Sequence, residues 1–181
     1  MISIDKTIET AALITVSEAK TQCRVDDSDP DISAIEAELT DTILDAVDIA
    51  THDINADVAH TTVVYTDTDF SGQYLTIKEG NFNTLSSVTL DAVEITPDAD
   101  HIEKHFGSFV LDFEESKAGK LVVTFTTGYA DANPLPRRLR RALLVKIHDL
   151  YDPERSSYTP NVFAAQKTYQ YLIAPYVRNY Y

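Results

Sequence analysis

The sequence contains very little sulfur and little glycine. Among its 181 residues are one Cys, one Met, no Trp and five Gly. A single cysteine cannot form an internal disulfide or a zinc site made of several thiolates, which excludes a disulfide scaffold and a zinc ribbon. Ala118–Gly119–Lys120 resembles the end of a phosphate-binding loop, but no glycine precedes it at the required spacing.

Long apolar runs are also missing. No stretch approaches the ~20 consecutive apolar residues that cross a bilayer. The N-terminal segment lacks the basic-then-apolar order of a signal peptide. We therefore expect a protein that is made in the cytoplasm and has no membrane partner.

Positive charge is scarce and unevenly placed. The chain has 15 Lys+Arg against 29 Asp+Glu, a net charge of -14, which disfavours binding along nucleic acid phosphates. Residues 1–130 hold 7 Lys+Arg and 25 Asp+Glu, net -18, whereas 131–181 hold 8 and 4, net +4. This split indicates an acidic body and a basic end that face different partners; chance and ordinary helix surface charge would also produce it.

Capping signals and apolar periodicity predict four helices, over residues 15–24, 30–52, 136–151 and 161–174. Thr15 to Glu18 match a capping box, and Asp29–Pro30 is a typical helix start. The second helix has an acidic outer face. Asn161 is suited to cap the last helix, which Pro175 ends or kinks.

Segments rich in β-branched and aromatic residues predict strands over 62–66, 74–77, 87–90, 109–113 and 121–126. Short connectors that contain Ser71–Gly72, Gly80–Asn81, Pro97–Asp98 and Ala118–Gly119 favour antiparallel hairpins. The predicted fold class is α+β: a mainly helical module of about four helices with an inserted antiparallel β-rich segment over about 61–127. We expect a single domain over 1–181.

The basic end begins with four arginines in the first turns of the third predicted helix: Arg137, Arg138, Arg140 and Arg141. Cations at this position oppose the positive end of the helix dipole. A nearby acidic surface or an acidic partner would offset that cost.

The chain ends in an aromatic and cationic tail over 175–181. Tyr176, Tyr180 and Tyr181 fall within six residues, together with Arg178. Such rings in a terminal segment predict a docking tail, while packing of the rings back onto the parent domain is an equal alternative.

Catalytic and metal-binding patterns are weak. His101 and His105 lie four residues apart, but Glu103 stands at the wrong position for a zinc protease motif. Cys23 has no motif that supplies a base, and the aspartate-rich turns lack the glycine and terminal glutamate of a calcium loop. We therefore predict no enzyme activity, no cofactor and no metal site.

Taken in order, several segments resemble tailed-phage head-tail connector proteins, the head-completion adaptors. Leu13 to Lys20 followed by Arg24 to Asp26 resembles that family's opening, LITLEEAKxHLRVD. Val123 to Tyr129, Ala142 to Leu144 with Leu150–Tyr151, and Leu172 to Tyr176 are similar to its second half. Residues 52–120 are the least diagnostic part.

The resemblance implies a structural virion protein at the neck of a particle made in a host cell. Such a protein forms a ring, typically dodecameric, beneath the portal protein, receives a stopper or tail-completion protein, and lets DNA pass without sequence-specific binding. It implies subunit contacts from the helix faces near 30–52 and 136–150, including the four arginines. It implies portal docking by about 161–181, through Tyr169, Leu172, Tyr176, Arg178, Tyr180 and Tyr181.

A second hypothesis rests on the charge of -14 alone. An acidic inhibitor that mimics DNA would present carboxylates in paired rows and bind a nucleic-acid-handling protein. Salt-sensitive capture of such a protein would favour this hypothesis over the connector.

Overall fold

The computed structural model describes residues 1–8, 13–95, 97, 101–129, 134–151 and 162–178, with side chains throughout except at 162–166. These residues group into two compact units. The β unit holds 1–8, 55–95, 97, 101–129 and 178, and the helical unit holds 13–54, 134–151 and 162–177. Our prediction of one domain over 1–181 stays a prediction.

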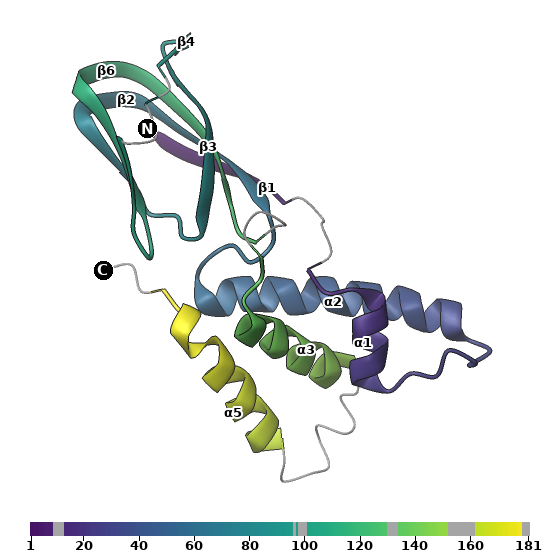
Figure 1. Ribbon diagram of the computed structural model, residues 1–181. Coiled ribbons are helices and arrows are strands. Elements are labelled where there is room, and N and C mark those ends of the chain that lie inside the picture. Colours follow the sequence, from purple (N-terminus) through teal and green to yellow (C-terminus); the bar gives the residue numbers. More distant parts are fainter. Residues whose placement is uncertain (9–12, 96, 98–100, 130–133, 152–161, 179–181) are drawn as a thin grey trace. The chain divides into compact units, whose positions relative to one another are not determined.

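The helical unit contains the elements α1 (Val16–Cys23), α2 (Ile32–Ile54), α3 (Arg137–Tyr151), α5 (Val162–Ile173) and the 3-10 helix η2 (Ala174–Tyr176) (Figure 1). The capping box predicted for α1 is present. The Glu18 N–H donates to the Thr15 hydroxyl at 3.2 Å, and the Thr15 N–H donates to the Glu18 carboxylate at 3.0 Å. Together these bonds satisfy two N–H groups that the start of a helix leaves without partners.

The core of the helical unit follows the apolar spacing of its helices. The buried side chains recur at three- and four-residue steps along α2 and α3, so each helix buries one face. They are Leu39, Thr42, Ile43, Ala46, Ala50 and Ile54 on α2, and Leu139, Ala142, Leu143 and Ile147 on α3.

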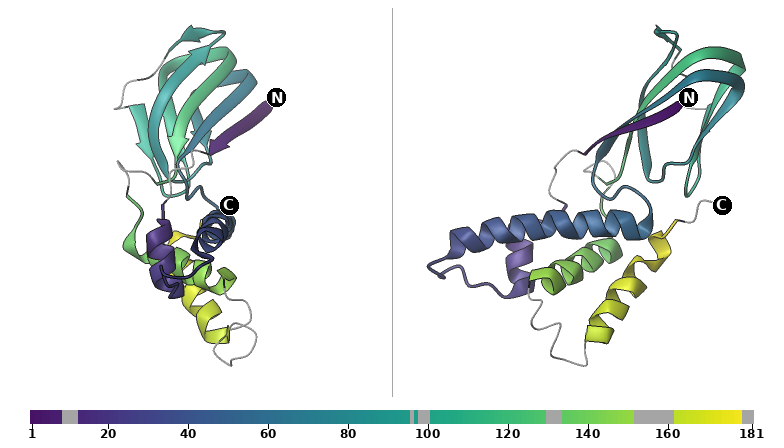
Figure 2. Two further views of the ribbon diagram at one scale, coloured as in Figure 1. Left: turned by 90° about the vertical axis from the view of Figure 1, so that its right-hand side faces the viewer. Right: turned by 180° about the vertical axis from the view of Figure 1, so that it is seen from behind.

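The β unit is an antiparallel sheet of six strands among the described residues. They are β1 (Ile2–Ile8), β2 (Thr61–Ile77), β3 (Phe82–Leu90), β4 (Val93–Glu94), β5 (Ile102–Lys104) and β6 (Phe109–Thr127). The strand order is β1-β2-β6-β3-β4, and β5 pairs with β6 (Figures 1 and 2).

Two predicted connectors are wrong. Ser71 and Gly72 pair with Ala118 and Lys117 inside the long strands β2 and β6, so the predicted strands 62–66 and 74–77 are two halves of β2. The register shifts between Asp67 and Phe70 and again between Gly72 and Tyr74. Local irregularities of this kind bend a strand without ending it, and glycine is tolerated there.

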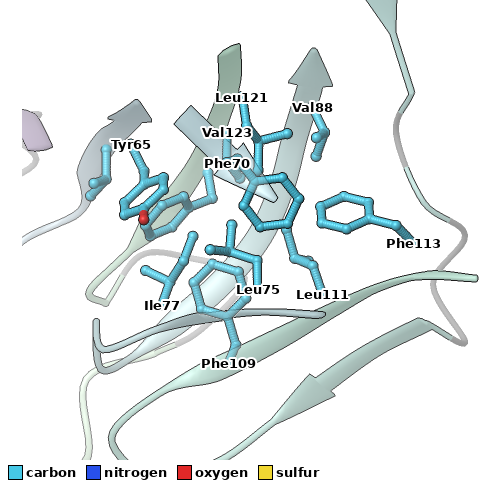
Figure 3. Close-up of a cluster of buried hydrophobic side chains, with 12 residues drawn as sticks. Tyr65, Phe70, Leu75, Ile77, Val88, Phe109, Leu111, Phe113, Leu121 and Val123 are labelled. Carbon is cyan, nitrogen blue, oxygen red and sulfur yellow. The ribbon is translucent and has the colours of Figure 1, made fainter. Parts of the chain in front are cut away.

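The bent strands enclose an apolar core (Figure 3). Alternate side chains of β2 and β6 point into it, as the period of two in a strand requires. Phe109 stacks against Phe82 with ring centroids 4.2 Å apart and meets Phe125 edge-on at 4.8 Å. The buried cluster consists of Val63, Tyr65, Phe70, Leu75, Ile77, Val88, Phe109, Leu111, Phe113, Leu121, Val123 and Phe125.

The N-terminal strand β1 did not enter the sequence prediction. It pairs with β2 from Ile2 opposite Asp67 to Ile8 opposite Thr61, and its side chains are exposed. The class α+β is confirmed, but "mainly helical" is not, since strands and helices hold similar shares of the structure. The difference arises because β2 and β6 run through the predicted connectors and β1 adds a strand outside 61–127.

Candidate functional site

Arg178, the last described residue, belongs to the β unit and is only 8% exposed. Its guanidinium contacts the side-chain oxygen of Asn81 and lies over the Phe106 ring, 4.5 Å from the centroid. The Asn55 amide donates to its backbone carbonyl at 3.3 Å. These contacts, here called the Arg178 site, hold Arg178 within the β unit.

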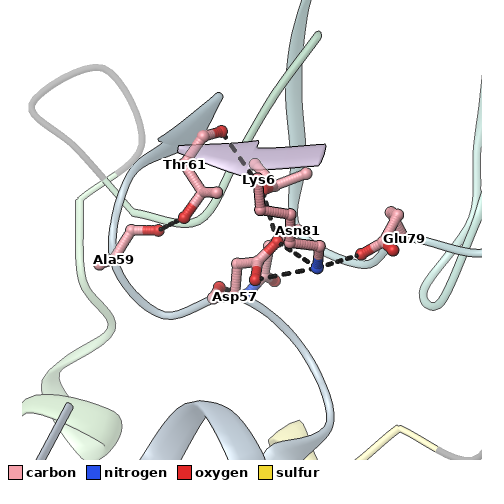
Figure 4. A network of polar contacts seen from close by, with 7 residues as sticks. Lys6, Asp57, Ala59, Thr61, Glu79 and Asn81 are labelled. Carbon is pink, nitrogen blue, oxygen red and sulfur yellow. Dashed lines mark hydrogen bonds and ion pairs between the residues drawn. The ribbon is translucent and has the colours of Figure 1, made fainter. Parts of the chain in front are cut away.

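The Arg178 site connects to a polar network around Asp57 (Figure 4). The Asn81 amide donates to the Asp57 backbone carbonyl at 2.8 Å. The Asp57 carboxylate accepts from the Thr127 hydroxyl at 2.7 Å and from Lys6 Nζ at 3.2 Å. Lys6 also donates to Glu79 at 2.8 Å. The network therefore joins β1 and β6 to Asp57 and to the turn that contains Glu79 and Asn81, the residue that contacts Arg178.

Lys6 remains a cation in this network. Burial alone lowers the pKa of Lys6, but hydrogen bonds and charges from Glu79 and Asp57 outweigh it, so the pKa is raised. The Asp57 side chain is 10% exposed, and a carboxylate so placed needs both its cation and its hydroxyl donor.

Gly80 leaves space that the Arg178 side chain fills. A Cβ at Gly80 would lie 2.2 Å from Nη1 of Arg178. We expect Gly80→Ala to displace the guanidinium. The state in which Arg178 occupies its site should lose about 1 kcal/mol, so that the state with Arg178 outside the site becomes about five times more populated. Trypsin cleavage after Arg178, followed by mass spectrometry, should accelerate accordingly.

Gly72→Ala is the matched control for this experiment. A Cβ there would meet its nearest neighbour at an ordinary 3.6 Å, so cleavage after Arg178 should keep its wild-type rate. Equal cleavage of the Gly80→Ala and wild-type proteins would show that the Arg178 site does not hold the C-terminal segment.

The other predicted docking residues divide by burial. Tyr169 is 4% exposed inside the helical unit, where its hydroxyl donates to Asp53 at 3.0 Å; burial, ahead of this hydrogen bond, raises its pKa. Leu172 and Tyr176 are half-buried. Tyr180 and Tyr181 lie outside the described residues. Tyr169 and Arg178 are therefore buried, each within its own unit, rather than exposed to a partner.

The four arginines of α3 fall into an inner and an outer pair. Arg138 donates to the Tyr171 carbonyl at 2.5 Å and lies over its ring, so it joins α3 to α5. Arg140 pairs with Glu18 of α1 through Nη2 and through Nε at 3.1 Å. Arg137 and Arg141 are exposed, four residues apart on one face.

The Arg140–Glu18 pair makes the helical unit sensitive to acid. The Arg140 hydrogen bond, helped by the Thr15 N–H, lowers the pKa of Glu18 from 4.5 to about 2. A carboxyl with a depressed folded-state pKa stabilises the fold above its unfolded pKa and loses that contribution as pH falls toward 2.

We expect Arg140→Gln to destabilise the protein by about 1 kcal/mol at pH 7, because both side chains are about one-third exposed and solvent screens the pair. The difference from wild type should shrink as pH falls below 4.5. Urea unfolding at a series of pH values measures it, and a pH-independent difference would contradict this role for the pair.

Other candidate groups stay apart in the structure. His101 lies 3.5 Å from Glu114, and His105 lies 3.8 Å from Glu103, so each imidazole faces its own carboxylate. Within the described ranges, no three His, Cys, Asp or Glu side chains gather at a metal-binding distance. No helix in that part of the chain is both long and apolar enough to span a membrane.

Sequence reasoning missed the surroundings of Arg178. The sequence predicts only a turn at Gly80–Asn81 and carries no signal at Phe106. A partial signal existed: Gly80–Asn81 combines a residue without a side chain with a polar one, which suits close approach by another segment. The pairing with a residue almost one hundred positions away could not be read from that signal.

No family model matches the chain, and no curated protein matches its sequence. Three solved structures match its fold over nearly the whole length, each at 16% identity. A chain in the neck of an empty gene transfer agent (GTA) particle, computed with C6 symmetry, has a TM-score of 0.72 and covers 99% of this chain and 97% of its own.

The second match is a chain in the virion of the native GTA particle, with a TM-score of 0.66, covering 93% of this chain and 94% of that one. The third is in the neck of the native particle, computed with C12 symmetry, with a TM-score of 0.61 and coverages of 100% and 97%. The chain thus has the fold of a particle neck protein, in agreement with its resemblance to head-tail connectors.

Proposed function

We propose that this chain is a structural head-tail connector of a phage-like particle, located in the neck. The observation that carries the proposal is the fold match over 99% of this chain and 97% of a GTA neck chain, which includes the helical and the β unit alike. An ordered set of connector-like segments in the sequence supports it independently. The role is structural rather than catalytic.

In this proposal the copies form a ring, dodecameric as in the family the sequence resembles, beneath the portal protein. The C6 and C12 symmetry of the GTA necks supports a cyclic arrangement. The ring would contact a stopper or tail-completion protein on its other side. This reading is favoured over a DNA mimic, because the mimic rests on net charge alone.

The C-terminal segment is the proposed portal-docking element. Tyr176, Tyr180, Tyr181 and Leu172 would contact the portal, since aromatic side chains often anchor interfaces. Arg178 and Tyr169 would hold the segment in position from inside the chain. Arg137 and Arg141 would contact a neighbouring subunit, while Arg138 and Arg140 fix α3 within the helical unit.

The acidic charge of the body fits a ring through which DNA moves. With 25 Asp+Glu against 7 Lys+Arg in residues 1–130, the body would repel phosphate rather than bind it. DNA would then pass without sequence-specific contacts or stalling.

Deleting the chain from the particle that carries it tests the proposal. We expect filled heads that retain the portal but lack tails, and full recovery when the chain is supplied again. Electron microscopy of purified particles counts tailed and tailless heads. Normally tailed particles in the deletion would overturn the proposal.

A further inference from the structure

The outward face of α3 is cationic. Arg137 and Arg141 are exposed and one turn apart, on the side opposite the buried Leu139 and Leu143. Both cations lie in the first turns of α3, where the helix dipole disfavours them. A carboxylate-bearing partner would remove that penalty.

The outward face of α2 has the complementary composition. Asp41, Asp45 and Asp48 are exposed along it, and Leu44, which is 53% exposed, lies among them. An apolar side chain surrounded by charged ones has the arrangement of an interface centre and its rim. Arginine is suited to both parts, since its aliphatic stem covers apolar surface while its guanidinium binds carboxylates.

The two faces cannot satisfy each other within one chain. α2 and α3 pack together through their buried faces in the helical unit, so their outward faces point away from each other. Two different, complementary faces on one molecule define a heterologous contact, and such contacts close into rings when the rotation between copies allows it.

We propose that the Arg137–Arg141 face of α3 in one copy binds the face of α2 formed by Asp41, Leu44, Asp45 and Asp48 in a second copy. This inference rests on the proposed ring and names its subunit contact. The arginines pair with the aspartates, and their stems cover Leu44.

Two charge-reversed variants test the contact. The first carries Arg137→Glu and Arg141→Glu, and the second carries Asp41→Lys, Asp45→Lys and Asp48→Lys. Each variant alone places like charges at every contact, so we expect its copy number on portal-bearing heads that lack the chain to fall at least about tenfold. An equimolar mixture should restore occupancy, because alternating copies bring opposite charges together at every contact of an even-numbered ring.

Quantitative mass spectrometry of the purified heads measures the copies bound, and circular dichroism confirms that both variants fold. Lys120→Glu, which reverses an exposed cation on β6 outside both faces and outside the docking segment, is the control and should bind like wild type. If either variant alone reaches wild-type occupancy, or the mixture of folded variants fails, the contact is refuted while the connector role stands. If wild-type protein itself does not bind the heads, the connector proposal fails as well.

Discussion

A chain truncated after Arg178 is expected to fold like the full-length protein yet to lose its binding to portal-bearing heads. The truncation removes Asn179, Tyr180 and Tyr181 and leaves Arg178 in its site against Asn81 and Phe106. If the two tyrosines are central anchors of the portal contact, their removal should lower affinity by 2 kcal/mol or more, about thirtyfold or greater. Co-sedimentation with heads that lack the chain measures the loss.

Two variants distinguish residues that contact the portal directly from the residue that positions the C-terminal segment. Tyr180→Ala with Tyr181→Ala should reproduce the truncation. Arg178→Lys should weaken binding less, since the lysine keeps the charge but cannot reproduce the planar guanidinium over Phe106. Unchanged binding of the truncated chain would place the portal contact elsewhere on the molecule.

Replacing Asp57 by alanine should cause a large loss of stability in the β unit. The substitution leaves Lys6 without its buried carboxylate and the Thr127 hydroxyl without its acceptor. A buried hydroxyl left without its acceptor costs about 1–3 kcal/mol. The lost ion pair adds less, because Lys6 is 37% exposed and keeps Glu79 as a partner. Because Lys6 lies on β1, hydrogen exchange of the β1 amides should accelerate, and chemical unfolding followed by circular dichroism should give the lost stability.

Asp69→Ala is the matched control. Asp69 pairs with the N-terminal amine at 3.2 Å, but its side chain is 86% exposed, so the loss should stay below about 1 kcal/mol. Asp57→Asn should fall between the two, because the amide keeps an acceptor for Thr127 but removes the charge. Equal losses for Asp57→Ala and Asp69→Ala would contradict a structural role for the buried network.

The local signals in the sequence account for much of the helical unit. The capping box at Thr15 and Glu18 forms as predicted, because it depends on residues three apart. The β unit was harder to read. Within a few residues of sequence, Gly72 and Gly119 each predict the end of a strand. Both lie inside long strands instead, and the bends of these strands depend on the sheet around them. Pattern alone does not distinguish a bulge from a turn.

The strand β1 illustrates a different limit. Ile2, Ile4 and Ile8 alternate with polar residues, which is the period of a strand, but they stand exposed rather than in the core. In the candidate site, too, the local sequence does not determine which side chains are buried. Composition marked Arg178 and the α3 arginines as unusual, whereas their division into buried and exposed positions depends on partners far away in the chain.

The location of the chain in the particle tests the central claim most directly. A small folded tag at the N-terminus of this chain should appear, in averaged electron microscopy images of whole particles, as extra density around the neck between head and tail. The density should follow the cyclic symmetry of the neck. Extra density on the head shell or along the tail, with an unchanged neck, would contradict a connector role.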